Sequence, residues 1–167
     1  LFKLVIYTTF NQKNIKPGLY SLKGIRTIQD LVKLITSISK DRINITLFEG
    51  WNINDIAESL SSILNIDKNK FISLCYNKAY IKSLGIDYNV ESLEGFLYPD
   101  TYIFLRTYNE RDIIRILTKR FMDIYNESIY PVAINSGLSV VDIIALASII
   151  EAEARLVEEM PIISSVY

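Results

Sequence analysis

Two glutamates close one of the most apolar segments of the chain, LASIIEAEARLVEEMP (residues 146–161). If this segment is helical, Glu151 and Glu153 point roughly 200° apart, because each residue turns the helix by about 100°. Glu151 then lies one turn above the small residues Ala147 and Ser148, which leave room for a ligand. A glutamate in an apolar wall holds its proton to higher pH, because burial disfavours the anion, and could then act as a general acid.

The same two acids could instead form the solvated end of a helix. Carboxylates at a helix C-terminus meet the negative end of the helix dipole, which is locally unfavourable. A local rule that is broken without evident structural gain is a mild indication of function. Both interpretations stay open on these residues alone.

A second group of candidates lies in ESLEGFLYPDTYIF (residues 91–104), where acids alternate with aromatic rings. The acids and tyrosines concerned are Glu94, Tyr98, Asp100 and Tyr102. Clefts that bind sugars often use such groups, carboxylates for hydrogen bonds and rings for stacking. The alternative is a set of core aromatics around an irregular loop, because Gly95 and Pro99 exclude one regular helix.

The turn FEGW (residues 48–51) offers a further pair, Glu49 and Trp51, that could bind a ligand. A tryptophan buried beside a helix cap is the commoner arrangement. The chain has no histidine and one cysteine, Cys75, which excludes Ser-His-Asp and Cys-His catalysis and a Cys/His metal cluster. The net charge of −1 and scattered basic residues give no patch for nucleic acid. We therefore expect no metal, no cofactor and no nucleic-acid partner.

Four helix starts position these residues. Each has Thr, Asn or Ser followed three residues later by Asp, ahead of a helical apolar pattern, and they begin at Thr27, Asn52, Asn109 and Ser139. In this pattern the first side chain accepts from a free backbone N–H, and the acid lies at the positive end of the helix dipole. The helix from 139 to 153 is predicted to be the most buried of all, from its composition.

Extended stretches at 17–24 and 43–50 precede the first two of these helices, which makes a weakly repeated strand–helix unit. We therefore predict an α+β fold, with a small strand–helix lobe over residues 1–64 and a mostly helical part over residues 65–167. The helical part should include one or two helices ending at Gly85, an amphipathic helix over 109–128, and a helix near Glu158 with Pro161 in its first turn.

No apolar run reaches the roughly 18 residues of a membrane helix, since LSVVDIIALASII is interrupted by Asp142 and Ser148. The chain begins at Leu1 inside a patterned segment, so we expect it to be a fragment of a longer protein. An anchor upstream of Leu1 is compatible with that expectation.

Three stretches together, LFEGWNINDIAESL, LEGFLYPDTYIF and LASIIEAEARLVEEMPIISSVY, resemble the MltG (YceG-like) family of endolytic murein transglycosylases. The upstream NIKPGLYSLKGIRTIQDLVKLI is similar to the family's small LysM-like lobe, so the resemblance extends over essentially the whole chain. The family's ASIVEKE-type motif reads ASIIEAE here, which implies Glu151 as the catalytic acid and Glu153 as the second acid of the motif. Ala152 stands where the family usually has lysine, and Met160 where an arginine is common.

The resemblance also implies that the loop with Glu94, Tyr98, Asp100 and Tyr102 flanks the substrate cleft. The implied activity is cleavage of nascent peptidoglycan strands between N-acetylmuramic acid and N-acetylglucosamine, leaving 1,6-anhydro-N-acetylmuramic acid ends. The implied setting is the bacterial inner membrane, with one N-terminal anchor outside this chain, a periplasmic or extracytoplasmic catalytic part, and peptidoglycan synthases as possible partners. Relative to the family pattern, residues 65–167 look like an incomplete catalytic domain. A non-catalytic peptidoglycan-binding or scaffold module is the alternative function.

Overall fold

Reciprocal hydrogen bonds mark where the helices begin. The computed structural model describes residues 22, 24–36, 42–86, 88–154 and 156–166. Asn52 accepts from the backbone N–H of Asp55 at 3.2 Å, and the Asp55 carboxylate accepts from the N–H of Asn52 at 3.1 Å. The same exchange joins the pairs that begin at Thr27, Asn109 and Ser139. All four predicted helix starts are confirmed.

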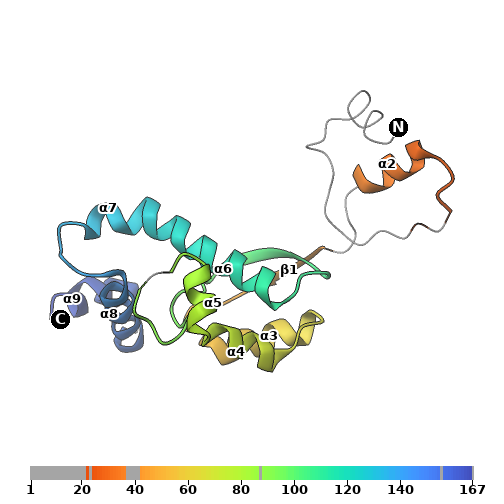
Figure 1. Cartoon of the computed structure of the whole chain (residues 1–167). Helices are drawn as coiled ribbons and strands as arrows, with labels where there is room; N and C mark the ends of the chain where they lie inside the picture. The colour runs from red at the N-terminus through yellow and green to blue at the C-terminus, as the bar shows by residue number, and fades with distance from the viewer. Residues whose placement is uncertain (1–21, 23, 37–41, 87, 155, 167) are drawn as a thin grey trace. The chain divides into compact units, whose positions relative to one another are not determined.

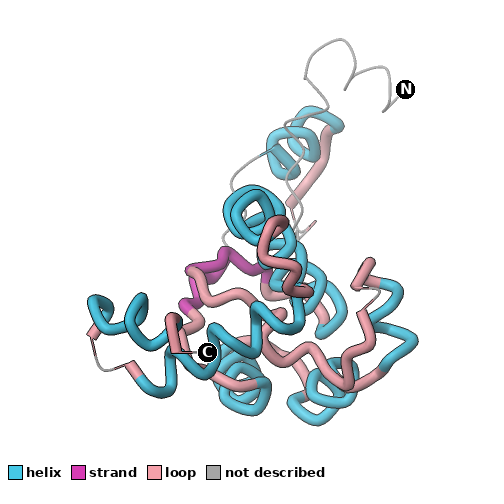
Figure 2. Tube along the Cα trace, turned by 90° about the vertical axis from the view of Figure 1, so that its left-hand side faces the viewer, coloured by secondary structure: helices cyan, strands magenta, loops and turns pink. Residues whose placement is uncertain are grey.

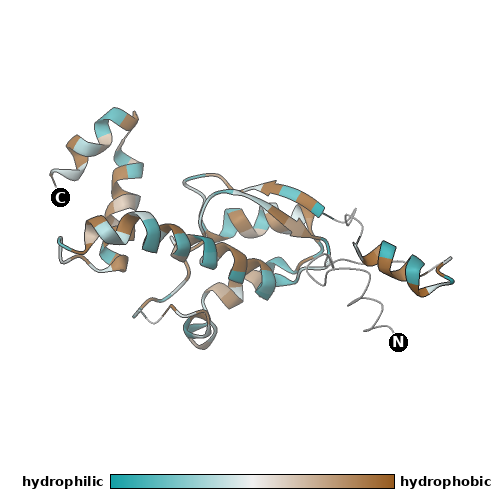
Figure 3. Ribbon diagram, turned by 90° about the horizontal axis from the view of Figure 1, so that it is seen from above, coloured by the Kyte–Doolittle hydropathy of each residue, from teal (hydrophilic) through white to brown (hydrophobic). Residues whose placement is uncertain are grey.

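The described chain is mostly helical (Figure 1). Its helices are α2 (Ile28–Thr36), α3 (Ile53–Ile63), α4 (Lys68–Cys75), α5 (Lys78–Ser83), α6 (Glu110–Ile124), α7 (Tyr130–Ala133), α8 (Val140–Glu153) and α9 (Met160–Ser164). A π-helical turn, η2 (Tyr125–Ile129), and a 3-10 turn, η3 (Val157–Glu159), complete the helical elements. The short α2 already has separate polar and apolar stripes (Figure 3). The two helices predicted before Gly85 and the one around Pro161 are confirmed as α4, α5 and α9.

Two strands, β1 (Arg42–Thr46) and β2 (Thr101–Leu105), pair in a small sheet (Figure 2). The hydroxyls of Thr46 and Thr101 are 2.9 Å apart, and Leu47 N–H donates to the Asp100 carbonyl at 3.0 Å. The residue after Thr46 thus pairs with the residue before Thr101, so the strands are antiparallel. The predicted α+β class is confirmed.

Backbone contacts divide the chain into two units, residues 1–44 with 103–108, and residues 45–102 with 109–167. Helix α3 packs on α4, and both belong to the second unit. The extended stretch predicted at 17–24 lies almost wholly outside the described residues. The LysM-like lobe over residues 1–64 therefore stays a prediction.

The second unit is built on the apolar faces of α3, α4 and α6 together with the 91–100 loop. Its most deeply buried side chains include Ile53, Leu60, Phe71, Leu93, Phe96, Ile113 and Leu117. One carboxylate is buried among them: Glu110, at the start of α6, is 5% exposed. It accepts from Lys70 Nζ at 2.7 Å and from the Asp67 N–H at 2.9 Å, so it ties the start of α4 to the start of α6.

The π-helical turn η2 joins α6 to α7 without a break in the helical path (Figure 1). Proline has no N–H, and its ring collides with the carbonyl four residues earlier, so Pro131 cannot continue a regular α-helix from α6. Residues 125–129 instead form a wider, π-helical turn, in which the Tyr130 N–H donates to the Tyr125 carbonyl five residues back. Tyr125 and Ile129 therefore lie on a wide turn.

The prediction that residues 139–153 form the most buried helix is wrong. In α8 only Val140 is buried, while Val141 and Ile149 are 37% and 40% exposed. Composition predicts how apolar a helix is, but burial depends on what packs against it. Among the described residues, the neighbours of α8 include the Gly95 turn and α9, and most of the helix stays exposed.

Candidate functional site

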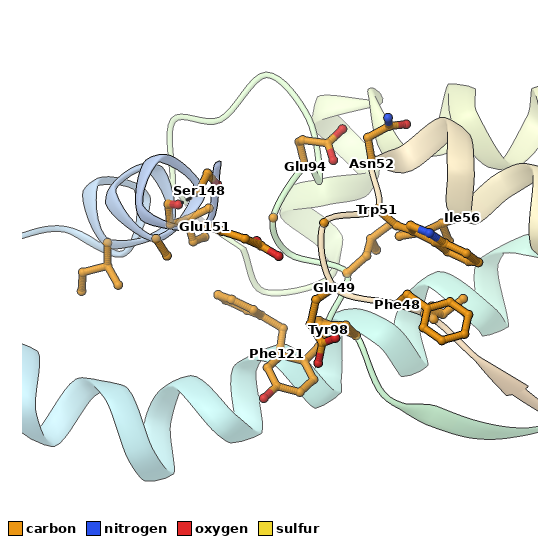
Figure 4. Close-up of a pocket in the computed structure, with 18 of the residues that line it drawn as sticks. Phe48, Glu49, Trp51, Asn52, Ile56, Glu94, Tyr98, Phe121, Ser148 and Glu151 are labelled. Carbon is orange, nitrogen blue, oxygen red and sulfur yellow. Dashed lines mark hydrogen bonds between the residues drawn. The ribbon is translucent and has the colours of Figure 1, made fainter. Parts of the chain in front are cut away.

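Three segments that are far apart in the sequence line one cleft of about 690 Å³ in the second unit (Figure 4). They are the turn after β1, the loop before β2, and one side of α8, with α6 and η2 adding further apolar side chains. The first two segments contribute Phe48, Glu49, Gly50, Trp51, Asn52, Glu94, Gly95, Tyr98 and Pro99. The helical elements contribute Ile56, Phe121, Tyr125, Ile129, Ile143, Ile144, Ala147, Ser148, Glu151 and Ala152. All three segments that the sequence analysis singled out therefore border the same cavity.

Helix α8 approaches the loop closely at Gly95. This glycine has a φ of +79°, in the left-handed region that favours glycine. A Cβ at this position would lie 2.3 Å from Ile144 Cγ2, which is closer than van der Waals contact allows. Because Gly95 has no side chain, α8 can pack directly on the loop, and this contact fixes the position of α8 relative to the loop.

Glu151 reaches from α8 toward the turn after β1. Its Oε1 lies 3.5 Å from the position a Cβ on Gly50 would take, so the carboxylate points toward that turn and lies close to it (Figure 4). Ala147, Ser148 and Glu151 line the cleft together, as the helical spacing predicted, and Glu153 is not part of the lining. The Glu151 side chain is nevertheless exposed to solvent, and so is Glu153. The sequence suggested that apolar neighbours bury part of the Glu151 carboxylate, and in this structure they do not.

Glu94 lines the cleft and has a structural contact as well. Its Oε2 accepts from the backbone N–H of Ile53 at 3.3 Å, at the first turn of α3. A carboxylate at a helix N-terminus is favoured by the helix dipole and by the free N–H groups there. Glu94 thus joins the 91–100 loop to α3, next to the Asn52 cap.

Tyr98, Asp100 and Tyr102 form a connected group around Arg120 of α6. The Arg120 Nε donates to Asp100 at 2.9 Å, and its guanidinium lies 5.8 Å from the centre of the Tyr98 ring. The buried Tyr102 donates its hydroxyl to the Tyr98 carbonyl at 2.6 Å. Of the three candidates only Tyr98 lines the cleft. Asp100 is linked to Tyr98 through Arg120, and Tyr102 is linked to it by the hydrogen bond to the Tyr98 carbonyl.

The titration of this group follows from those contacts. The Thr101 N–H and the Arg120 side chain both donate to the Asp100 carboxylate, and they hold its pKa below the usual value. Burial raises the pKa of Tyr102, and the nearby Asp100 charge adds to the effect. At neutral pH, therefore, an anionic Asp100 forms an ion pair with a cationic Arg120, and a neutral Tyr102 donates its hydroxyl to the Tyr98 carbonyl.

The turn after β1 places two aromatic rings in the cleft. Phe48 is 57% exposed, Trp51 is half-buried, and their ring centres are 5.1 Å apart in an edge-on arrangement. Trp51 therefore lies beside the Asn52 cap without being fully buried. The sequence analysis did not single out Phe48, Arg120 or Tyr125. The position of Phe48 directly before Glu49 in the FEGW turn was the available signal for the first of these.

No group of three or more Cys, Asp or Glu side chains within the described parts of the chain could hold a metal ion. The cleft's polar groups are three carboxylates, from Glu49, Glu94 and Glu151, with hydroxyl and amide groups beside them. These groups can exchange protons and accept hydrogen bonds from hydroxyl or amide groups of a ligand.

The model of the YceG-like family matches residues 1–167. The chain belongs to the YceG-like family, which is the MltG family. Comparison with curated proteins gave no match.

Among solved structures, the chain is similar to a YceG-like protein from Listeria monocytogenes, known from a 2.6 Å crystal structure. The TM-score is 0.62 at 21% identity, and the match covers 95% of this chain and 57% of the Listeria chain. This likeness supports the fold. The chain spans little more than half the length of that family member.

Proposed function

We propose that this protein is an endolytic murein lytic transglycosylase with Glu151 as its catalytic residue. The observation that carries the proposal is the convergence of the FEGW turn, the LEGFLYPDTY loop and the ASIIEAE helix on one cleft, with Glu151 facing the turn. The family match over the whole chain supports the same conclusion. The substrate would be nascent peptidoglycan, cut between N-acetylmuramic acid and N-acetylglucosamine.

One carboxyl group is sufficient for this reaction. Protonated Glu151 gives its proton to the glycosidic oxygen as the bond from that oxygen to C1 of N-acetylmuramic acid breaks. The resulting carboxylate then takes the proton of the same sugar's C6 hydroxyl as that oxygen bonds to C1. The product is a 1,6-anhydro ring, and Glu151 ends protonated as it began. The nucleophile belongs to the substrate, so its proximity replaces a bimolecular step.

The open position of Glu151 gives the substrate a part in this mechanism. An exposed carboxylate has to hold its proton until the leaving oxygen is in reach, and water opposes this. A glycan strand lying in the cleft would displace that water and leave Glu151 between the bound sugar and the apolar side chains of α8 and Phe121. We therefore propose that the bound glycan completes the water-excluded surroundings in which Glu151 transfers its proton.

The cellular setting is also part of the proposal. We propose an inner-membrane protein whose anchor precedes these residues and whose catalytic part faces the periplasm, with peptidoglycan synthases as partners. No helix in the described stretches is long and apolar enough to cross a bilayer.

The two glutamates of α8 provide a matched test. Glu151→Gln should abolish the release of anhydro-muropeptides from purified peptidoglycan, measured by mass spectrometry, while the circular dichroism spectrum stays that of the parent protein. Glu153→Gln is the control, because it makes the same change on the same helix outside the cleft, and it should retain most activity. Full product release by the Glu151 variant would refute the assignment, and a larger loss in the Glu153 variant would transfer it to Glu153. If the parent protein binds glycan but never yields anhydro ends, the non-catalytic binding module is the correct function.

A further inference from the structure

The aromatic pair of the FEGW turn, Phe48 and Trp51, does not belong to the buried core. Phe48 is one of the most exposed large apolar side chains of the second unit, at 57%, and it lines the cleft beside the half-buried Trp51. In Figure 4 both rings lie on the side of the turn away from Glu151. The pair therefore borders a part of the cleft that is separate from the carboxylate.

The turn holds the two rings in a fixed arrangement. Trp51 N–H donates to the Phe48 carbonyl at 3.4 Å, and Gly50 between them has a φ of +75°. Directly afterwards, Asn52 caps α3 with two hydrogen bonds. The rings are thus anchored between the end of β1 and the start of α3, so little conformational freedom would be lost when a ligand packs on them.

The charges around the cleft limit the kind of ligand. Among the described residues that line it there are three glutamates and no lysine or arginine. Such a lining repels phosphate groups and other polyanions. It suits a ligand that offers hydroxyl and amide donors to the carboxylates and an apolar face to the rings. A pyranose ring with equatorial substituents has this form, because its C–H bonds point up and down from the ring face.

We propose that Phe48 and Trp51 form a sugar-stacking subsite that holds a pyranose ring of the glycan strand at a distance from the glycosidic bond whose oxygen Glu151 protonates. This inference rests on the proposed function and assigns a role to residues outside the reacting group. The ring face of one sugar packs on one ring of the pair, and the other ring, which meets the first edge-on, borders the bound sugar. Glu49, between the two rings in sequence, accepts hydrogen bonds from that sugar's hydroxyl groups.

The single tryptophan of the chain makes the subsite directly observable, since Trp51 is the only strong fluorophore in the sequence. The Glu151→Gln variant is titrated with N-acetylglucosamine oligomers and with glycan strands isolated from peptidoglycan. Binding should shift the Trp51 emission to shorter wavelength and protect it from quenching by iodide, because the stacked sugar excludes water. Binding seen by calorimetry with no change in Trp51 emission or quenching would overturn the subsite.

Substitution of Phe48 tests the same contact by affinity. In the Glu151→Gln background, Phe48→Ala should weaken glycan binding about tenfold, and Phe48→Tyr should keep the affinity within about twofold because the ring remains. Tyr76→Ala is the control, since Tyr76 is 50% exposed and does not line the cleft. In the active protein, Phe48→Ala should raise KM with little change in kcat, as expected of a contact made equally in ground and transition states.

The outcomes separate this inference from the proposed function. Unchanged affinity in Phe48→Ala, together with normal release of anhydro products by the active protein, overturns the subsite and leaves the enzyme assignment standing. Loss of kcat without loss of affinity also overturns it, because the residue would then act at the reaction. No glycan binding by any form of the protein overturns both.

Discussion

Replacing Gly95 by alanine tests whether the close approach of α8 to the loop governs the site. Two costs add in Gly95→Ala. A non-glycine residue in the left-handed region costs about 1–2 kcal/mol. The overlap of its Cβ with Ile144, at 2.3 Å, forces α8 or the loop to move, and overpacking of this kind costs about 1–3 kcal/mol. We expect the free energy of unfolding to fall by roughly 2–5 kcal/mol.

The control for this prediction is Gly137→Ala. Gly137 has a φ of +73°, close to that of Gly95, but nothing lies within 4 Å of the Cβ position. This variant should therefore lose only the backbone cost of about 1–2 kcal/mol. In a chain of this size each kcal/mol lowers the midpoint of thermal unfolding by roughly 2–4 °C, so the two variants are distinguishable by circular dichroism.

A second substitution identifies the clash itself. Ile144→Ala removes the Cγ2 that the new Cβ would meet, so the double variant of Gly95 and Ile144 should be more stable than the sum of the two single changes predicts. Activity should fall in Gly95→Ala beyond the effect of stability, because a shift of about 1 Å in the catalytic group can cost a hundredfold in rate. Equal destabilisation in Gly95→Ala and Gly137→Ala, with no coupling to Ile144, would refute the contact and with it this account of how α8 is positioned.

Three further predictions follow from single side chains. Burial raises the pKa of Glu110, but the hydrogen bonds from Lys70 and from the Asp67 N–H outweigh it and hold the pKa below its ordinary 4.5. Glu110→Gln should therefore lower the free energy of unfolding by about 1–2 kcal/mol at pH 7. The difference from the parent should vanish as pH falls through the lowered pKa, which denaturant unfolding at several pH values would test. Arg120→Ala should raise KM severalfold with little loss of stability, because the ion pair with Asp100 is partly exposed while Tyr98 loses the contact of its ring with the guanidinium. Equal kinetics for the variant and the parent would exclude this positioning role. Burial, with a smaller contribution from the Glu94 charge, raises the pKa of Cys75 to about 12, so the thiol should resist alkylation at pH 8 until the protein unfolds, and rapid labelling of the native protein would contradict the packing around it.

The features predicted correctly from the sequence are those that depend on residues close to one another in the chain. The capping pairs were correct because donor and acceptor are three residues apart, so the sequence alone brings them together. The face of α8 that carries Glu151 followed from helical spacing in the same way. The contact of Arg120 with Asp100 spans twenty residues, and that of Gly95 with Ile144 spans forty-nine. No periodicity carries information over such distances, so these contacts needed the structure.

The burial of α8 failed for a related physical reason. An apolar composition measures the tendency of a helix to leave water, and it says nothing about whether other elements cover each face. Glu94 illustrates the opposite case, because the sequence analysis treated it as a ligand-binding acid and the structure gives it a capping contact with Ile53 in addition to its place in the cleft. A residue of this kind joins the site to the fold, so its substitution would affect both.

The two Glu-Gly pairs of the sequence explain how the cleft is assembled. Glu49-Gly50 and Glu94-Gly95 each end in a glycine with positive φ, at +75° and +79°. Helix α8 contacts both turns, with Ile144 on Gly95 and Glu151 on Gly50. These two α8 residues are two helical turns apart and so share a face. One helix face therefore lies across both glycine turns, and the packing of Ile144 on the second turn sets the position of the Glu151 carboxylate over the first.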